Sequence, residues 1–156
     1  MKAFKILSIA LLSLMTLNSC SDDVYYESEP VYQETWYVED FRITPNMWKL
    51  VGEPGEIGSY YRCVIGGLPL KDSYYDGVVT AYIYFDYDTP DEVQTPLPFT
   101  EYFIGRNSKN EEVPYSIQYS YDVAANGTIA FKAYVSDYYT DLFRPGTEDF
   151  RVAIVW

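Results

Sequence analysis

Hydrophobic and polar residues alternate in short runs along the chain from about residue 35 to its end. The clearest run covers residues 78–85, where every second side chain is apolar and the positions between include Tyr82 and Tyr84. The apolar set consists of Val79, Ala81, Ile83 and Phe85. Because neighbouring side chains of a strand point to opposite faces, this run predicts a strand with one core face and one half-exposed tyrosine face.

The same pattern predicts seven or eight short strands, with turn residues every 8–15 positions, no helix of three turns and no internal repeat. We expect strands at residues 36–44 (with a phase break at Glu39-Asp40), 47–51, 57–65, 78–85, 97–104, 115–121, 129–135 and 150–156. Asn126-Gly127 predicts a hairpin, residues 86–95 a long acidic loop and residues 70–75 one helical turn. We therefore expect an all-β fold over residues 35–156, a single antiparallel β-sandwich of immunoglobulin-like or jelly-roll type.

The first 19 residues have the composition of a secretory signal peptide. Lys2 and Lys5 give a positive start, and an apolar stretch of 12 residues follows at 6–17. A membrane-spanning helix needs about 20 apolar residues, so this stretch fits a signal and is too short for an anchor helix.

The tetrapeptide Leu17-Asn18-Ser19-Cys20 at the end of this stretch resembles the bacterial lipobox. The resemblance implies that Cys20 is acylated with diacylglycerol and palmitate and becomes the mature N-terminus. The next residues, Ser21-Asp22-Asp23, resemble the acidic export signal of Bacteroidetes surface lipoproteins. We therefore expect attachment to outer-membrane lipid through Cys20, exposure at the cell surface, and an acidic tether over residues 20–34.

Charge and composition exclude several function classes. The chain has 23 acidic residues against 11 basic ones, which gives a net charge of −12, so we do not expect nucleic acid as a partner. It contains no histidine, so the Ser-His-Asp and Cys-His mechanisms and ordinary zinc sites are excluded. Cys63 lies within a predicted strand, and we interpret it as a buried structural thiol. We do not expect an enzyme.

Two groups of residues are candidates for ligand binding. Carboxylates are dense in the loop after residue 85, where Asp86, Asp88, Asp91 and Glu92 supply the oxygen ligands that calcium prefers. The alternative is a solvated acidic loop that binds no cofactor. Eighteen tyrosines form the second signal, and we predict aromatic platforms for glycans at Tyr74, Tyr75, Tyr82, Tyr84, Tyr138 and Tyr139. The alternative is that these rings are half-buried in sheet faces without any ligand.

Four segments resemble a group of small uncharacterised Bacteroidetes surface lipoproteins. These segments are residues 76–84, 95–99, 127–131 and 150–155. Their motifs are strand cores and turns, so the resemblance implies a fold and a location and carries over no catalytic residue. The expected function is a lipid-anchored, non-catalytic binding module, for glycans through exposed tyrosines. The alternative is a structural or accessory subunit of an envelope or fimbria-like assembly.

Overall fold

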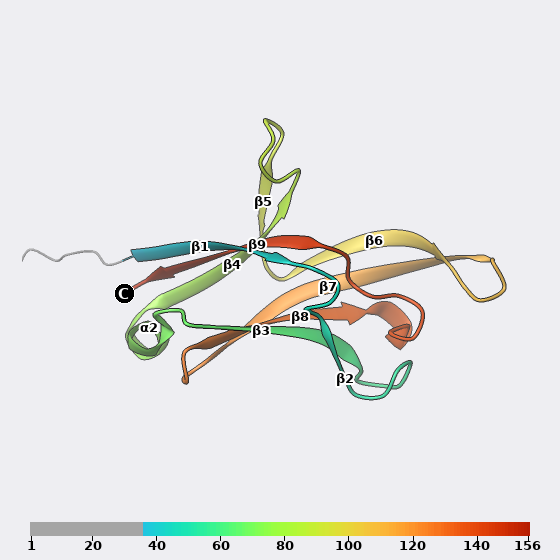
Figure 1. Ribbon diagram of the computed structural model, residues 1–156, viewed down its shortest axis with the longest axis horizontal. Coiled ribbons are helices and arrows are strands. Elements are labelled where there is room, and N and C mark those ends of the chain that lie inside the picture. Colours follow the sequence, from blue (N-terminus) through green and yellow to red (C-terminus); the bar gives the residue numbers. More distant parts are fainter. Residues whose placement is uncertain (1–35) are drawn as a thin grey trace, which may run out of the picture. The chain divides into compact units, whose positions relative to one another are not determined.

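Two antiparallel sheets pack face to face in the computed structural model (Figure 1). The structure describes residues 36–156, except for the side chains of residues 71–73, so the predicted signal peptide, Cys20 and the tether lie outside the described residues. The four-stranded sheet has the order β1 (Trp36–Ile43), β9 (Glu148–Val155), β4 (Val78–Phe85) and β5 (Val93–Pro96). The five-stranded sheet has the order β2 (Lys49–Val51), β3 (Tyr60–Gly66), β8 (Thr128–Val135), β7 (Glu112–Ala124) and β6 (Phe99–Arg106). The predicted antiparallel β-sandwich is confirmed.

Phe150 of β9 lies at the centre of the core between the sheets. Its ring stacks on Phe131 of β8 with centroids 4.4 Å apart, and it meets the rings of Trp48 at 6.2 Å and Tyr119 at 6.0 Å. All four side chains are 2% exposed or less. Burial of one such ring contributes about 1.5–3 kcal/mol, so this cluster is a main source of the attraction between the two sheets.

The alternation along β4 places its side chains as predicted, with one exception. Ala81 and Ile83 are buried in the core, and Val79 and Phe85 are partly buried against it. On the opposite face Tyr82 is half-buried, but Tyr84 is only 5% exposed. The prediction of a half-exposed Tyr84 is wrong, because residues of β9 and of the β4–β5 loop cover its ring.

Short local signals are also confirmed. Asn126-Gly127 lies in the turn between β7 and β8, where Gly127 has φ +84° and donates to the carbonyl of Ala124 at 3.0 Å. A seven-residue helix, α2 (Leu70–Asp76), connects β3 to β4, and a 3₁₀ turn, η1 (Ser136–Tyr138), follows β8. Within residues 36–156 no helix is long and apolar enough to cross a membrane.

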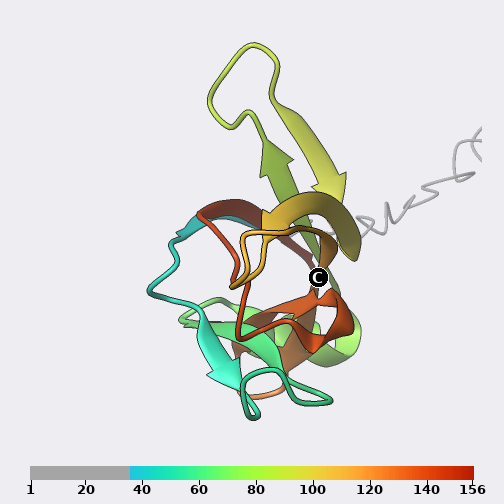
Figure 2. The same ribbon diagram turned by 90° about the vertical axis from the view of Figure 1, so that its right-hand side faces the viewer.

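Several predicted boundaries are wrong. β1 runs unbroken through Glu39-Asp40, because the charged residues there pair with β9. β5 begins at Val93, inside the predicted acidic loop, because it pairs with β4 at the edge of the four-stranded sheet. The end of this hairpin projects from the sandwich (Figure 2). β3 starts only at Tyr60, after a turn that contains Gly58 at φ +85°. The described residues thus contain nine strands where seven or eight are predicted.

Candidate functional site

The tetrapeptide Glu-Asp-Phe-Arg occurs twice, at residues 39–42 and at residues 148–151. The first copy lies in β1 and the second in β9, and the two strands pair antiparallel with Phe41 opposite Phe150. This register places the aspartate of each copy opposite the arginine of the other. We expected no internal repeat, because a repeat of four residues is too short to stand out in the sequence. Its significance becomes clear only from the pairing of the two strands.

Both aspartate–arginine pairs are bidentate. Arg151 donates from Nε and Nη2 to the two carboxylate oxygens of Asp40, at 2.7 and 2.9 Å. Arg42 donates in the same way to Asp149, at 2.8 and 3.1 Å. Two parallel N–H···O bonds fix the plane of each guanidinium as well as its position. The outer face of the four-stranded sheet therefore carries two oriented arginines side by side.

Two tyrosine rings pack on these arginines. The guanidinium of Arg151 lies 5.1 Å from the ring centroid of Tyr84, and that of Arg42 lies 5.7 Å from the ring of Tyr87. The two rings are 5.0 Å apart and tilted by 60°. Tyr84 comes from β4 and Tyr87 from the loop after it, so this loop folds the aromatic residues over the ion pairs.

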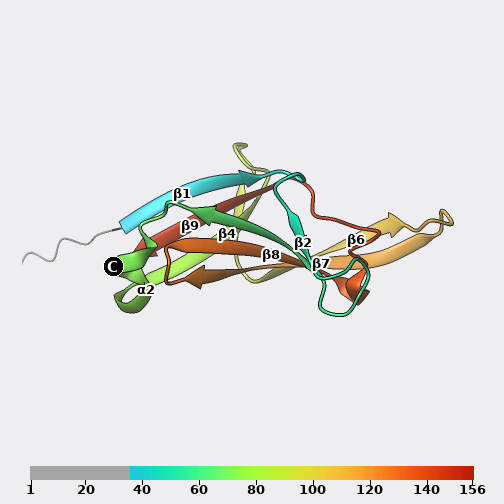
Figure 3. The same ribbon diagram turned by 60° about the horizontal axis from the view of Figure 1, so that its bottom comes forward.

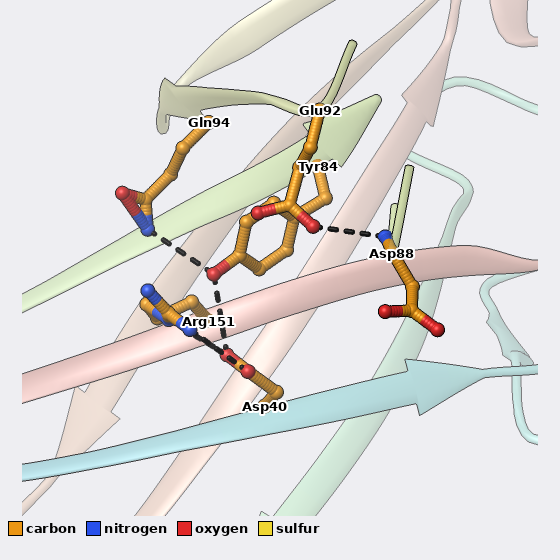
Figure 4. A network of polar contacts seen from close by, with 6 residues as sticks. All are labelled: Asp40, Tyr84, Asp88, Glu92, Gln94 and Arg151. Atoms are coloured by element: carbon orange, nitrogen blue, oxygen red, sulfur yellow. Dashed lines mark hydrogen bonds and ion pairs between the residues drawn. The ribbon is translucent and has the colours of Figure 1, made fainter. Parts of the chain in front are cut away.

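The hydroxyl of Tyr84 lies between a carboxylate and an amide (Figure 4). It donates to Asp40 at 3.5 Å and accepts from the side chain of Gln94 at 3.4 Å, and both contacts are long and weak. The strongest partner of the Asp40 carboxylate is thus Arg151, and the contact with Tyr84 is weaker.

A pocket of about 290 Å³ opens beside this network. It is lined by Asp40, Phe41, Arg42, Tyr87, Asp88 and Asp149, and we call it the polar pocket. In the described part of the chain no acceptor contacts Nη1 of Arg42, whose side chain is 60% exposed. The polar pocket therefore offers hydrogen-bond donors, carboxylate acceptors and an aromatic ring within one small volume.

The electrostatics at the polar pocket favour an ionised Asp40 and neutral tyrosines. The hydrogen bond from Arg151 holds the pKa of Asp40 below its usual value, despite partial burial. The negative charge of Asp40 is the main cause that raises the pKa of Tyr87, and burial is the main cause that raises the pKa of Tyr84. At neutral pH both phenols therefore keep their protons and can donate.

The carboxylates predicted to bind calcium lie in the loop between β4 and β5. The backbone N–H of Asp88 donates to Glu92 at 2.9 Å, so one glutamate oxygen already serves to close the loop. Asp86 and Asp88 have φ of 53° and 62°. Asp91 donates its backbone N–H to the hydroxyl of Thr89. In residues 36–156 no group of three or more carboxylates or thiols is placed to hold a metal ion, and calcium binding stays a prediction.

The six predicted tyrosines lie in three separate places. Tyr74 and Tyr75 belong to α2, and their rings meet edge to face at 4.9 Å. Tyr82 and Tyr84 lie on the outer face of β4. Tyr138 is 40% exposed in η1, whereas the next residue, Tyr139, packs against the core. Of these six only Tyr84 borders the polar pocket, through its contact with Tyr87, a residue that the sequence patterns did not single out.

A second polar group lies inside the sandwich. The hydroxyl of Tyr119 donates to Glu148 at 2.8 Å, and burial raises the pKa of Glu148, with a further increase from the charge of Glu101. Burial likewise raises the pKa of Glu101. The indole N–H of Trp48, whose ring lies 6.4 Å from that of Tyr119, is buried and has no hydrogen-bond partner among residues 36–156. Sequence patterns gave no sign of this group, because Glu101 and Glu148 are far apart in the sequence and neither belongs to a motif.

An apolar groove of about 560 Å³ lies on the β6–β7 hairpin. Its walls include Tyr102, Ile104, Pro114, Ser116 and Ser136. Tyr102 is 81% exposed and Ile104 is 75% exposed, on a strand that forms one edge of the five-stranded sheet. Large apolar side chains at an unpaired edge are a common feature of surfaces that bind another chain.

Comparison with known proteins adds no relative: no family model matches the chain, and no curated protein or solved structure is significantly similar to it. The functional argument therefore rests on the residues and geometry described above.

Proposed function

We propose that this protein is a lipid-anchored surface lipoprotein whose β-sandwich binds glycans, without catalysis, in the polar pocket. The observation that carries the proposal is the combination of Arg42, Asp149 and Tyr87 in one pocket of about 290 Å³. Sugar hydroxyls both donate and accept hydrogen bonds, so a fixed guanidinium next to a carboxylate suits them, and the face of a sugar ring packs on an aromatic ring.

The chemistry of the polar pocket supports binding more than catalysis. In each of the two guanidinium–carboxylate pairs at the polar pocket, the arginine donates to both carboxylate oxygens, so the aspartates are held in fixed positions. A general acid or base needs a pKa near the working pH, and Arg151 shifts the pKa of Asp40 away from that range. The pocket is small and suits one sugar residue at the end of a chain.

The test is a glycan array probed with the detergent-solubilised full chain, with and without calcium. Binding to one sugar class is expected, and Tyr87→Ala should weaken it about threefold to tenfold, which corresponds to the loss of one aromatic contact. Arg42→Ala should weaken it further, since a charged hydrogen bond is lost. Tyr102→Ala is the matched control, because that tyrosine is 81% exposed on β6, outside the polar pocket.

A blank array from a folded protein would count against glycan binding. Binding that survives Tyr87→Ala and Arg42→Ala would assign it to another surface. Dependence on calcium would implicate the loop of Asp86, Asp88, Asp91 and Glu92.

A second candidate function is an accessory subunit of an envelope or fimbria-like assembly. The unpaired edge of β6, with exposed Tyr102 and Ile104, favours it, because a strand of another chain can add to such an edge. Cross-linking on intact cells tests this candidate. Partners captured by the wild-type chain should be lost on Tyr102→Lys with Ile104→Lys, and retained in the Tyr87→Ala variant.

A further inference from the structure

Exposed apolar residues gather at the end of the sandwich where the described chain begins. Figure 3 shows the start of β1, the C-terminus and α2 together at this end, and the turn of the β6–β7 hairpin at the other. Trp36 is 69% exposed here, and Tyr75 on α2 is 80% exposed. Most large apolar side chains are buried, so a contiguous group of exposed ones indicates an interaction site.

The strand register shows that the exposed residues of β1, β9 and β4 at this end are contiguous. Val155 of β9 pairs with Trp36 of β1 on one side and with Val78 of β4 on the other, and these two valines are 53% and 62% exposed. The next cross-strand row on the same outer face consists of Val38, Ala153 and Thr80. Neither row contains a charged residue, although the chain has a net charge of −12. We call these six residues the apolar patch, and Tyr75 lies on α2 at the same end of the sandwich.

The proposed lipid anchor at Cys20 favours a bilayer as the occupant of this patch. Fifteen residues, 21–35, separate Cys20 from Trp36. Even fully extended, they span only about 50 Å, so the end of the sandwich that carries Trp36 is held within that distance of the bilayer surface. At such short range a contact that would be weak for a free protein gains from its high effective concentration.

We infer that the apolar patch docks on the lipid bilayer at the headgroup–acyl boundary and thereby orients the sandwich on the membrane. The inference rests on the proposed lipid anchor at Cys20. Tryptophan and tyrosine are the residues that prefer this boundary. The polar pocket lies further along the same sheet face, two cross-strand rows from Trp36 at Asp40 and Arg151, so docking holds it at a fixed distance above the surface.

The test uses the full-length protein, purified from membranes and reconstituted into vesicles of dibrominated phosphatidylcholine. A zwitterionic lipid is chosen because the acidic chain is repelled by anionic headgroups. Flotation of the protein with the vesicles reports the anchor. Quenching of tryptophan fluorescence by bromine reports docking. The experiment uses a Trp156→Phe background, in which the two remaining tryptophans are the exposed Trp36 and Trp48, which is only 2% exposed.

The expected result is flotation together with quenching of Trp36, and loss of the quenching but not of flotation in Val78→Glu with Val155→Glu. Tyr102→Glu with Ile104→Glu is the matched control, since it adds the same charge at two exposed apolar positions of β6, and it should leave quenching unchanged. Flotation without quenching overturns the docking inference alone. Protein that does not float overturns both the anchor and the docking. If Trp36 is shielded from iodide but not quenched by bromine, protein covers the patch and the inference is wrong.

Discussion

Asp40 and Arg151 lie directly opposite each other on β1 and β9, and both carboxylate oxygens of Asp40 accept hydrogen bonds from one guanidinium, at 2.7 and 2.9 Å. The two residues are 111 positions apart in the sequence, so their pairing fixes the register between the first and last strands of the sandwich. A slip of one residue would separate Asp40 from Arg151 and Arg42 from Asp149 at once, and it would turn Phe150 out of the core.

The first prediction concerns the pH dependence of this pair. Arg151 lowers the pKa of Asp40 in the folded protein, so the pair stabilises the fold above the unfolded value of about 3.9 and loses this effect as pH falls through the lower folded value. Asp40→Asn should cost about 0.5–1 kcal/mol at pH 7, since both side chains are about one-third exposed. In urea denaturation at a series of pH values, the difference in free energy of unfolding between wild type and variant should disappear below about pH 4.

The control for this prediction is Glu112→Gln. Glu112 contacts Arg106 at 3.2 Å through a single oxygen, with both side chains more than half exposed, so its loss should hardly change stability. If the free energies of unfolding of wild type and Asp40→Asn differed by the same amount from pH 7 to pH 3, the lowered pKa of Asp40 would be contradicted.

Glu148 should show the opposite pH dependence. Burial raises its pKa in the folded protein, despite the hydrogen bond from Tyr119, so the folded state binds this proton more tightly than the unfolded chain does. Its contribution to stability is therefore fully present below the unfolded value of about 4.3 and is lost as pH rises through the folded value. Glu148→Gln should gain in stability relative to wild type between pH 4 and pH 7, measured by the same urea series. If the free energies of unfolding of the two proteins differed by the same amount at every pH, Glu148 would have the same pKa in the folded and unfolded states, and the prediction would be wrong.

The sequence predicted the elements that depend on neighbouring residues. Alternation in residues 78–85 and the Asn126-Gly127 turn both correspond to structure, because side-chain period and turn chemistry act over a few positions. The fold class followed from the number of such runs. The first strand was predicted with nearly the right bounds, but the phase break expected at Glu39-Asp40 was wrong, because these charged residues pair with β9, where Arg151 lies opposite Asp40.

The candidate site was harder to predict for the same reason. Tyr84 was expected to be half-exposed from its place in β4, but its burial comes from Arg151 and from Tyr87. Tyr87 itself stands in an acidic segment without periodicity, where only the folded loop shows what its ring contacts. Contacts between residues far apart in the sequence determine the burial of Tyr84 and the position of the Tyr87 ring. No local sequence pattern reveals such contacts.

A third prediction concerns Gly105 on β6, where a ring packs directly on the backbone. A Cβ at this position would lie 2.2 Å from Phe143 Cε1 and 2.9 Å from Tyr115 Cε1, and these two rings are stacked at 3.9 Å. Gly105→Ala should therefore destabilise the protein by about 1–3 kcal/mol, because the stacked rings must shift. Gly66→Ala is the control, since its Cβ would meet only Thr128 Cγ2, at an ordinary 3.7 Å.

A double-mutant cycle tests the cause of that loss. If the clash with Phe143 is responsible, Gly105→Ala should cost much less in a Phe143→Ala background, so the two effects are not additive. Additive effects in thermal or urea denaturation would mean that the Phe143 ring moves away without cost.

The last prediction concerns Cys63, the free thiol of β3. Its side chain is 4% exposed, faces Phe131 across the strand pair, and has its pKa raised mainly by burial. Because the thiolate is the reactive form, Cys63 should react with a disulfide reagent only when the sheet opens. In a Cys20→Ser variant, labelling at pH 8 should be at least about a hundredfold slower in native buffer than in guanidinium, as expected for a local opening free energy of about 3 kcal/mol.

Substitutions at Cys63 give a second measurement. Cys63→Ala should leave the fold intact, whereas Cys63→Ser should cost about 1–3 kcal/mol more because its hydroxyl finds no partner among the apolar neighbours. Native labelling as fast as in guanidinium would instead show that the β3–β8 edge opens freely, and Cys63 would no longer count as part of the core.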